Sequence, residues 1–96
     1  MLRIELQETE KPVTMRIEGR FAGKYAEDAR GVIANYHATI LTGFIVNVSE
    51  VVFVDATGEA VLSWLARMGG RFVSDNSYSL NVCKRLRLPM ARKLRR

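Results

Sequence analysis

The sequence predicts a small α/β domain: a four-stranded mixed sheet, made of an N-terminal hairpin plus parallel strands, with about three helices packed against it. Two segments of period-two alternation come first, and segments of helical period then alternate with short apolar runs. Strands that alternate with helices imply crossover connections and parallel pairing. The 96 residues, 48% hydrophobic and 26% charged, suit one globular domain.

The first two strands are expected to form the hairpin. Apolar and polar residues alternate over residues 2–7 and again over residues 13–18, and a polar turn at 8–12 joins them. Gly19 is expected to end the second strand. The first strand then lies at an edge of the sheet, where it offers a surface for pairing into a homodimer.

A helical period follows the hairpin. Apolar residues at i, i+4, i+7, i+8 and i+11 form one stripe, and this stripe predicts the buried face of a helix: Tyr25, Ala29, Val32, Ile33 and Tyr36. Thr42 and Gly43 are expected to stop this segment. His37 lies opposite the stripe and is expected to be a solvated surface histidine.

The run at 44–48 is short, apolar and rich in β-branched residues, so it predicts a central strand covered on both faces. A polar pair at 49–50 separates it from a second apolar run at 51–54, which we interpret as an apolar turn. The sequence Asp-Ala-Thr-Gly at 55–58 then opens the second helix.

The second helix is expected to bury a stripe made of Val61, Leu62, Leu65 and Met68, with Trp64 at its edge. Thr57 is a candidate N-cap, and Glu59 lies favourably in the first turn. Gly69 and Gly70 indicate the C-terminal end of the helix.

The last elements are a short strand at 71–74 and a helix at 79–88, separated by turn and cap residues at 75–77. This helix is expected to pack through Val82, Cys83 and Leu86, and Pro89 to end it. We expect residues 1–90 to form the domain and residues 91–96 a basic C-terminal tail.

The composition argues against several function classes. One cysteine and one histidine exclude an internal disulfide and a metal site built from His and Cys. No catalytic constellation and no phosphate-binding motif is recognisable, so we expect no enzymatic activity, cofactor, metal or small-molecule substrate. The chain lacks a signal-peptide pattern and a long apolar run, which predicts a cytoplasmic protein.

The positive charge is concentrated near the C-terminus. Residues 83–96 hold seven basic side chains and no acid: Lys84, Arg85, Arg87, Arg92, Lys93, Arg95 and Arg96. Residues 1–82 keep eight basic against ten acidic residues. The basic segment either binds nucleic acid or an acidic membrane surface, or is a solvated helix end. Residues 79–96 lack aromatic side chains for stacking on bases, which favours the solvated helix end and argues against nucleic acid as a partner.

The start of the second helix is the most informative segment. A helix N-terminus presents unpaired N–H groups and a partial positive charge, so it favours an anion or a phosphorylated side chain. Simple capping by Asp55 and Thr57 explains the same residue types. Both interpretations remain open on the sequence alone.

This segment and its flanks resemble the STAS domain family, the anti-sigma factor antagonists and their relatives. The matching stretch is FIVNVSEVVFVDATGEAVLSWLARMGGRFVSDNSYSLNVCKRLRL, and IEGRF at residues 17–21 is similar to the second strand and turn of the family. The resemblance covers residues 2–88. It implies the fold inferred above and a small cytoplasmic module that binds a kinase-like anti-sigma factor.

The resemblance also implies a site. In the family, the Ser or Thr directly after the motif aspartate is phosphorylated by the partner, which blocks binding. Ala56 stands at this position here, so Thr57 is the remaining candidate for phosphorylation. Asn47 and Glu59 also replace the usual aspartate and leucine. The implied partner-binding residues are Asp55, Ala56, Thr57, Gly58 and Glu59.

Two other functions remain open. Some STAS proteins are accessory subunits of lipid-transporting ABC complexes, and some of these end soon after a Leu-Pro pair such as Leu88-Pro89. An ABC ATPase is then the partner. A weaker alternative is a nucleic-acid binder that uses residues 84–96, whose binding would fall steeply with salt.

Overall fold

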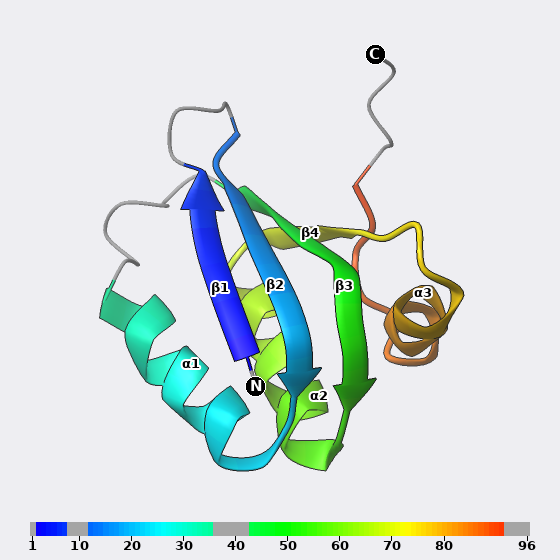
Figure 1. Cartoon of the computed structure of the whole chain (residues 1–96). Helices are drawn as coiled ribbons and strands as arrows, with labels where there is room; N and C mark the ends of the chain where they lie inside the picture. The colour runs from blue at the N-terminus through cyan, green and yellow to red at the C-terminus, as the bar shows by residue number, and fades with distance from the viewer. Residues whose placement is uncertain (1, 8–11, 36–42, 92–96) are drawn as a thin grey trace.

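The computed structural model describes residues 2–7, 12–35 and 43–91. Its elements run in the predicted order (Figure 1): β1 (Leu2–Gln7), β2 (Thr14–Phe21), α1 (Gly23–Asn35), β3 (Phe44–Val54), α2 (Ala56–Arg67), β4 (Gly70–Val73) and α3 (Ser77–Arg85). The expected positions of Tyr36, His37 and the stop at Thr42 lie outside the described residues.

The strands form one sheet in the order β1-β2-β3-β4. β1 and β2 pair antiparallel, whereas β2–β3 and β3–β4 pair parallel, as the sequence predicts. α1 and α2 lie on one face of the sheet (Figure 1). The core between these layers includes the fully buried side chains Met15, Ile17, Val46, Leu65 and Phe72.

β2 does not end at Gly19 as predicted. The strand continues to Phe21. Its register with β3 shifts between Arg16 and Glu18 and again between Gly19 and Arg20. Gly19 has a φ of 104°, a conformation that glycine adopts without a steric penalty. The irregularity keeps the strand going and brings the fully buried Phe21 under the start of α2.

The predicted turn at 51–54 is also wrong, because β3 runs unbroken from Phe44 to Val54. β4 pairs only with residues 44–47 of this long strand. Beyond them, the Asn76 amide donates to the carbonyl oxygens of Ser49 and Val51 at 2.9 and 3.3 Å. The backbone N–H of Val54 donates to the Tyr78 hydroxyl at 2.8 Å. The start of α3 therefore takes the place of a fifth strand along this part of β3.

Asn76 has a second role as the N-cap of α3, where its side-chain oxygen accepts from the backbone N–H groups of Tyr78 and Ser79. We expect Asn76→Ala to lower the free energy of unfolding by about 2 kcal/mol, since the cap and the bonds to β3 are lost together. Urea unfolding measures this. Ser77→Ala at the neighbouring exposed position is the control, with an expected change within about 0.5 kcal/mol. Equal effects of the two substitutions would contradict this role of Asn76.

α1 buries only part of the predicted stripe. Ala29 and Ile33 are buried as predicted and Ala26 is buried with them, but Tyr25 and Val32 are 56% and 52% exposed. The helix is rotated so that two small alanine side chains face the sheet, and small side chains allow close packing of the helix. The large apolar residues on the neighbouring stripe therefore remain at the surface.

α3 begins two residues earlier than predicted and ends at Arg85, before the positive φ of Arg87. The chain then returns to β4: the Phe72 N–H donates to the Pro89 oxygen, and the Ala91 N–H donates to the Phe72 oxygen. The start of the expected tail is thus attached to the sheet edge at Ala91. Residues 92–96 lie outside the described part of the chain.

Candidate functional site

Asp55 joins the starts of two helices. One carboxylate oxygen accepts from the Gly58 N–H at 2.8 Å, which makes Asp55 the N-cap of α2. The other oxygen accepts from the Gly23 N–H at the start of α1 at 3.0 Å. The prediction that Thr57 caps α2 is wrong, because the strand ends at Val54 and Asp55 is the last non-helical residue. Thr57 lies inside the first turn.

Gly58 is buried where the first turn of α2 meets the end of β2. A Cβ atom at this position would overlap the backbone oxygen of Phe21 and lie 3.0 Å from the Cγ1 atom of Val54. Only glycine allows this close approach of helix and strand. Gly58 therefore holds the start of α2 close to β2 and β3 and is not itself at the surface.

Glu59 is held by the last turn of α3. Its carboxylate accepts a hydrogen bond from the Arg85 guanidinium at 2.7 Å. This bond and the charge of Glu59 raise the pKa of Arg85, so the guanidinium stays positive. One of the basic residues near the C-terminus thus has an acidic partner within the domain.

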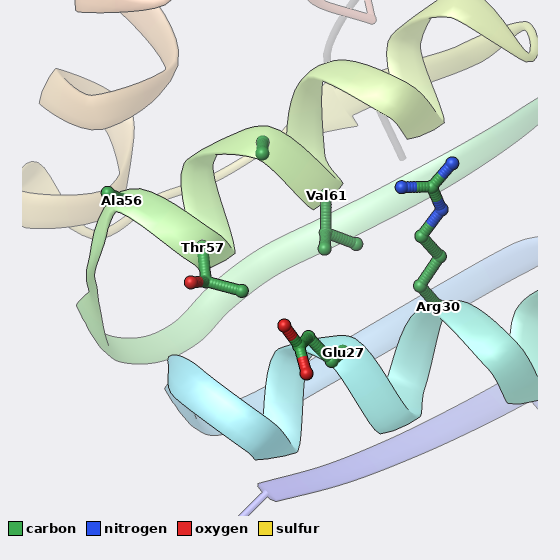
Figure 2. Close-up of a pocket in the computed structure, with 6 residues that line it drawn as sticks. Glu27, Arg30, Ala56, Thr57 and Val61 are labelled. Carbon is green, nitrogen blue, oxygen red and sulfur yellow. The ribbon is translucent and has the colours of Figure 1, made fainter.

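The two remaining residues of the segment face solvent. Ala56 is exposed and Thr57 is half-buried, and both line an open hollow between α1 and α2. We call this feature the α1–α2 hollow; its lining residues are Glu27, Arg30, Ala56, Thr57, Ala60 and Val61. Figure 2 shows Thr57 of α2 and Glu27 of α1 on facing sides of it. The guanidinium of Arg30 lies 4.8 Å from the centre of the Trp64 ring.

The structure therefore divides the five predicted site residues. Asp55, Gly58 and Glu59 have contacts within the protein, while Ala56 and Thr57 are open to a partner from the side of the hollow. Sequence reasoning missed Glu27 and Arg30 of α1, which line the hollow. Their spacing of three residues, directly beside the true buried stripe of α1, is the signal that places them on the flank towards α2.

The described residues hold no cluster of three or more His, Cys, Asp or Glu side chains that could bind a metal ion. No helix in the described ranges is long and apolar enough to cross a membrane. Cys83 is a free thiol on the inner side of α3, 1% exposed. It belongs to the core and not to the surface around Ala56.

Burial raises the pKa of the Cys83 thiol from 9.0 to about 11. We expect iodoacetamide to modify the folded chain far more slowly than the urea-unfolded chain, because little thiolate forms and access is blocked. The unfolded chain also loses this proton first as the pH rises. The contribution of Cys83 to stability is therefore present below about pH 9 and is lost as the pH rises towards 11.

The control for this pH dependence is Cys83→Ala, which lacks the thiol, so only the parent chain should show the fall in the free energy of unfolding that Cys83 causes between about pH 9 and pH 11. Native labelling as fast as that of the unfolded chain would show that Cys83 is not held in the core.

A four-stranded mixed sheet with an antiparallel β1–β2 pair, crossover helices on one face and a third helix at the edge of β3 defines the STAS fold, as the resemblance predicts. A solved structure with this fold is the anti-sigma factor antagonist SpoIIAA in its unphosphorylated form. The TM-score is 0.65 at 18% sequence identity, over 96% of this chain and 90% of that chain. No protein-family model and no curated protein matches the sequence.

Proposed function

We propose that this chain is a non-enzymatic STAS-type interaction module that binds a kinase-like anti-sigma factor through the start of α2 and the α1–α2 hollow. The observation that carries the proposal is that the exposed Ala56 and the half-buried Thr57 line the hollow on a segment fixed by Asp55 and Gly58. The likeness in fold to an anti-sigma factor antagonist supports the choice of partner.

The segment suits docking because it is rigid. Asp55 bonds to both helix starts, Gly58 contacts β2 and β3, and Glu59 pairs with Arg85 of α3. A partner that contacts Ala56 and Thr57 therefore meets a surface that loses little conformational freedom on binding. Glu27 and Arg30 offer one charge of each sign beside it.

The chemistry of this surface favours the unphosphorylated form. Ala56 has no hydroxyl group to accept a phosphate. Thr57 has one, but the carboxylates of Asp55, Glu59 and Glu27 belong to the same segment or line the same hollow. A phosphate on Thr57 would add about −1.5 to −2 charges among these acids. Control of the module then comes from its abundance or from the partner.

The binding test is a charge placed on the exposed methyl group of Ala56. We expect Ala56→Glu to weaken binding of the purified anti-sigma partner at least tenfold, about 1.4 kcal/mol, because the new carboxylate lies at the centre of the contact. Isothermal titration calorimetry measures the affinity. Ala34→Glu is the matched control and should bind like the parent chain, because Ala34 is an exposed residue in the last turn of α1 and does not line the hollow. Unchanged affinity of Ala56→Glu would refute docking at this segment.

Two further measurements identify the partner and the acceptor. Co-purification of an ABC ATPase in place of a kinase-like protein would favour the transport function. Incubation with the partner kinase and ATP, followed by mass spectrometry, tests the acceptor: any stoichiometric phosphate should map to Thr57 and vanish in Thr57→Val. Stoichiometric phosphate at another residue would contradict this account of the site.

A further inference from the structure

The edge of the sheet at β1 has the features of an interface. β1 is a terminal strand, and within the described residues no strand pairs with its outer edge. Its three apolar side chains on the helix-facing side, Leu2, Ile4 and Leu6, are only half-buried. Unpaired backbone groups beside half-buried apolar side chains are a template for pairing with another chain.

The charges on the opposite side of β1 are self-complementary. Arg3 and Glu5 flank Ile4 and pair with each other at 2.7 Å. A two-fold axis at Ile4 would place Arg3 of one copy opposite Glu5 of the second copy, and Leu2 opposite Leu6. An axis at Arg3 or at Glu5 would instead place like charges opposite each other, which destabilises a strand pair. The charges therefore select one register.

The next strand continues this pattern. Arg3 lies opposite Glu18 of β2, and Glu5 lies opposite Arg16. With the axis at Ile4, each row across the joined sheets would alternate in sign: Glu18 and Arg3 of one copy, then Glu5 and Arg16 of the other. This alternation favours a second copy over a partner of arbitrary charge.

α1 supplies a separate observation. Tyr25 and Val32, seven residues apart and more than half exposed, lie on one stripe of the helix. Glu27 and Arg30 mark the flank of α1 that faces α2, on the other side of the buried stripe. The exposed apolar stripe therefore faces away from α2, and α1 lies on the β1 side of α2 in Figure 1. The stripe of Tyr25 and Val32 therefore points towards the outer edge of β1.

We propose that two copies of this chain pair antiparallel through β1, centred on Ile4, to form one continuous eight-stranded sheet with Tyr25 and Val32 of each copy beside the two-fold axis. The paired strands bury Leu2, Ile4 and Leu6 and satisfy the backbone groups of both edges. This interface is separate from the start of α2, so each copy keeps its docking segment.

Sedimentation of the full chain over a concentration series tests the proposal, and a species of twice the chain mass is expected. Arg3→Glu and Glu5→Arg should each weaken dimerisation at least tenfold, because each places like charges opposite each other. An equimolar mixture of the two variants should restore the dimer, since every cross-copy pair then has opposite signs. This rescue also shows that both variants are folded.

Cross-linking tests the register. Paired residues across antiparallel strands have Cα atoms within disulfide range, so Ile4→Cys should give a disulfide-linked dimer under oxidation. Arg3→Cys is the matched control and should not, because its counterpart in the second copy lies opposite Glu5. A parent chain that stays monomeric at its solubility limit, or a dimer unaffected by both charge reversals, would overturn the proposal. The Ala56→Glu variant should still dimerise, so this result is independent of the partner.

Discussion

Gly58→Ala is expected to lower the free energy of unfolding by about 3 kcal/mol or more, which is a large share of the stability of a domain of this size. The added methyl group would overlap the backbone oxygen of Phe21, and a backbone atom cannot move aside as a flexible side chain can. The first turn of α2 must therefore separate from β2. Thermal or urea unfolding followed by circular dichroism measures the loss.

Gly31→Ala is the matched control, because it makes the same substitution in the middle of α1. Apart from its chain neighbours and the backbone of its own helix, no atom of the described residues lies within 4 Å of the position of its Cβ atom, and Gly31 is not at a positive φ. Alanine there should raise stability by about 0.5–1 kcal/mol through its higher helix propensity. The two substitutions are thus expected to act in opposite directions, and equal effects would disprove the close contact at Gly58.

Asp55→Ala is expected to lower the free energy of unfolding by about 2–4 kcal/mol. The carboxylate accepts two hydrogen bonds from backbone N–H groups of different helices, and bonds to a charged acceptor are worth more than neutral ones. Its removal loses the cap of α2 and the link to the start of α1 together. Chemical denaturation of the purified variant gives the value.

Asp28→Ala provides the comparison for Asp55. Asp28 is an exposed residue of α1 whose nearest cation, the ammonium of Lys24, lies 3.8 Å away. A surface pair of this kind contributes little, so a change within about 0.5 kcal/mol is expected. If Asp55→Ala changed stability no more than Asp28→Ala does, the carboxylate would not be the structural link, and a direct role in docking would be favoured.

The order of the elements and the sheet pairing were predictable because each depends on a strong local pattern. Period-two alternation marks β1 and β2, and strands that alternate with helices imply parallel pairing. Element ends were less predictable. Glycine usually weakens or ends a strand. Gly19 instead adopts a positive φ, and β2 continues after a register shift.

The face of α1 could not be predicted from hydrophobicity alone. Tyr25 and Val32 of the predicted stripe are exposed, whereas the smaller Ala26, outside that stripe, is buried with Ala29 and Ile33. Packing distance decided the outcome, and the sequence does not encode this distance in any single residue. A partner that covers Tyr25 and Val32 would explain why large apolar side chains occupy that stripe.

The motif locates the candidate site, but the role of each residue within it depends on the three-dimensional structure. Asp and Thr are both good capping residues, and the choice between Asp55 and Thr57 depends on where β3 ends. The link from Asp55 to Gly23 crosses 32 positions in the chain, beyond the reach of local patterns. The position of Glu27 and Arg30 on the flank of α1 that faces α2 can be predicted only once the buried stripe of α1 is known.

The cover that α3 supplies along β3 has a consequence for biosynthesis. Ribosomes build the chain from its amino end, so the long central strand emerges well before Asn76 and Tyr78, whose side chains bond to its backbone. During that interval, the N–H and C=O groups of β3 that later bond to Asn76 and Tyr78 have no partner. The susceptibility of the newly made chain to aggregation should therefore fall sharply once residues 76–85 have left the exit tunnel.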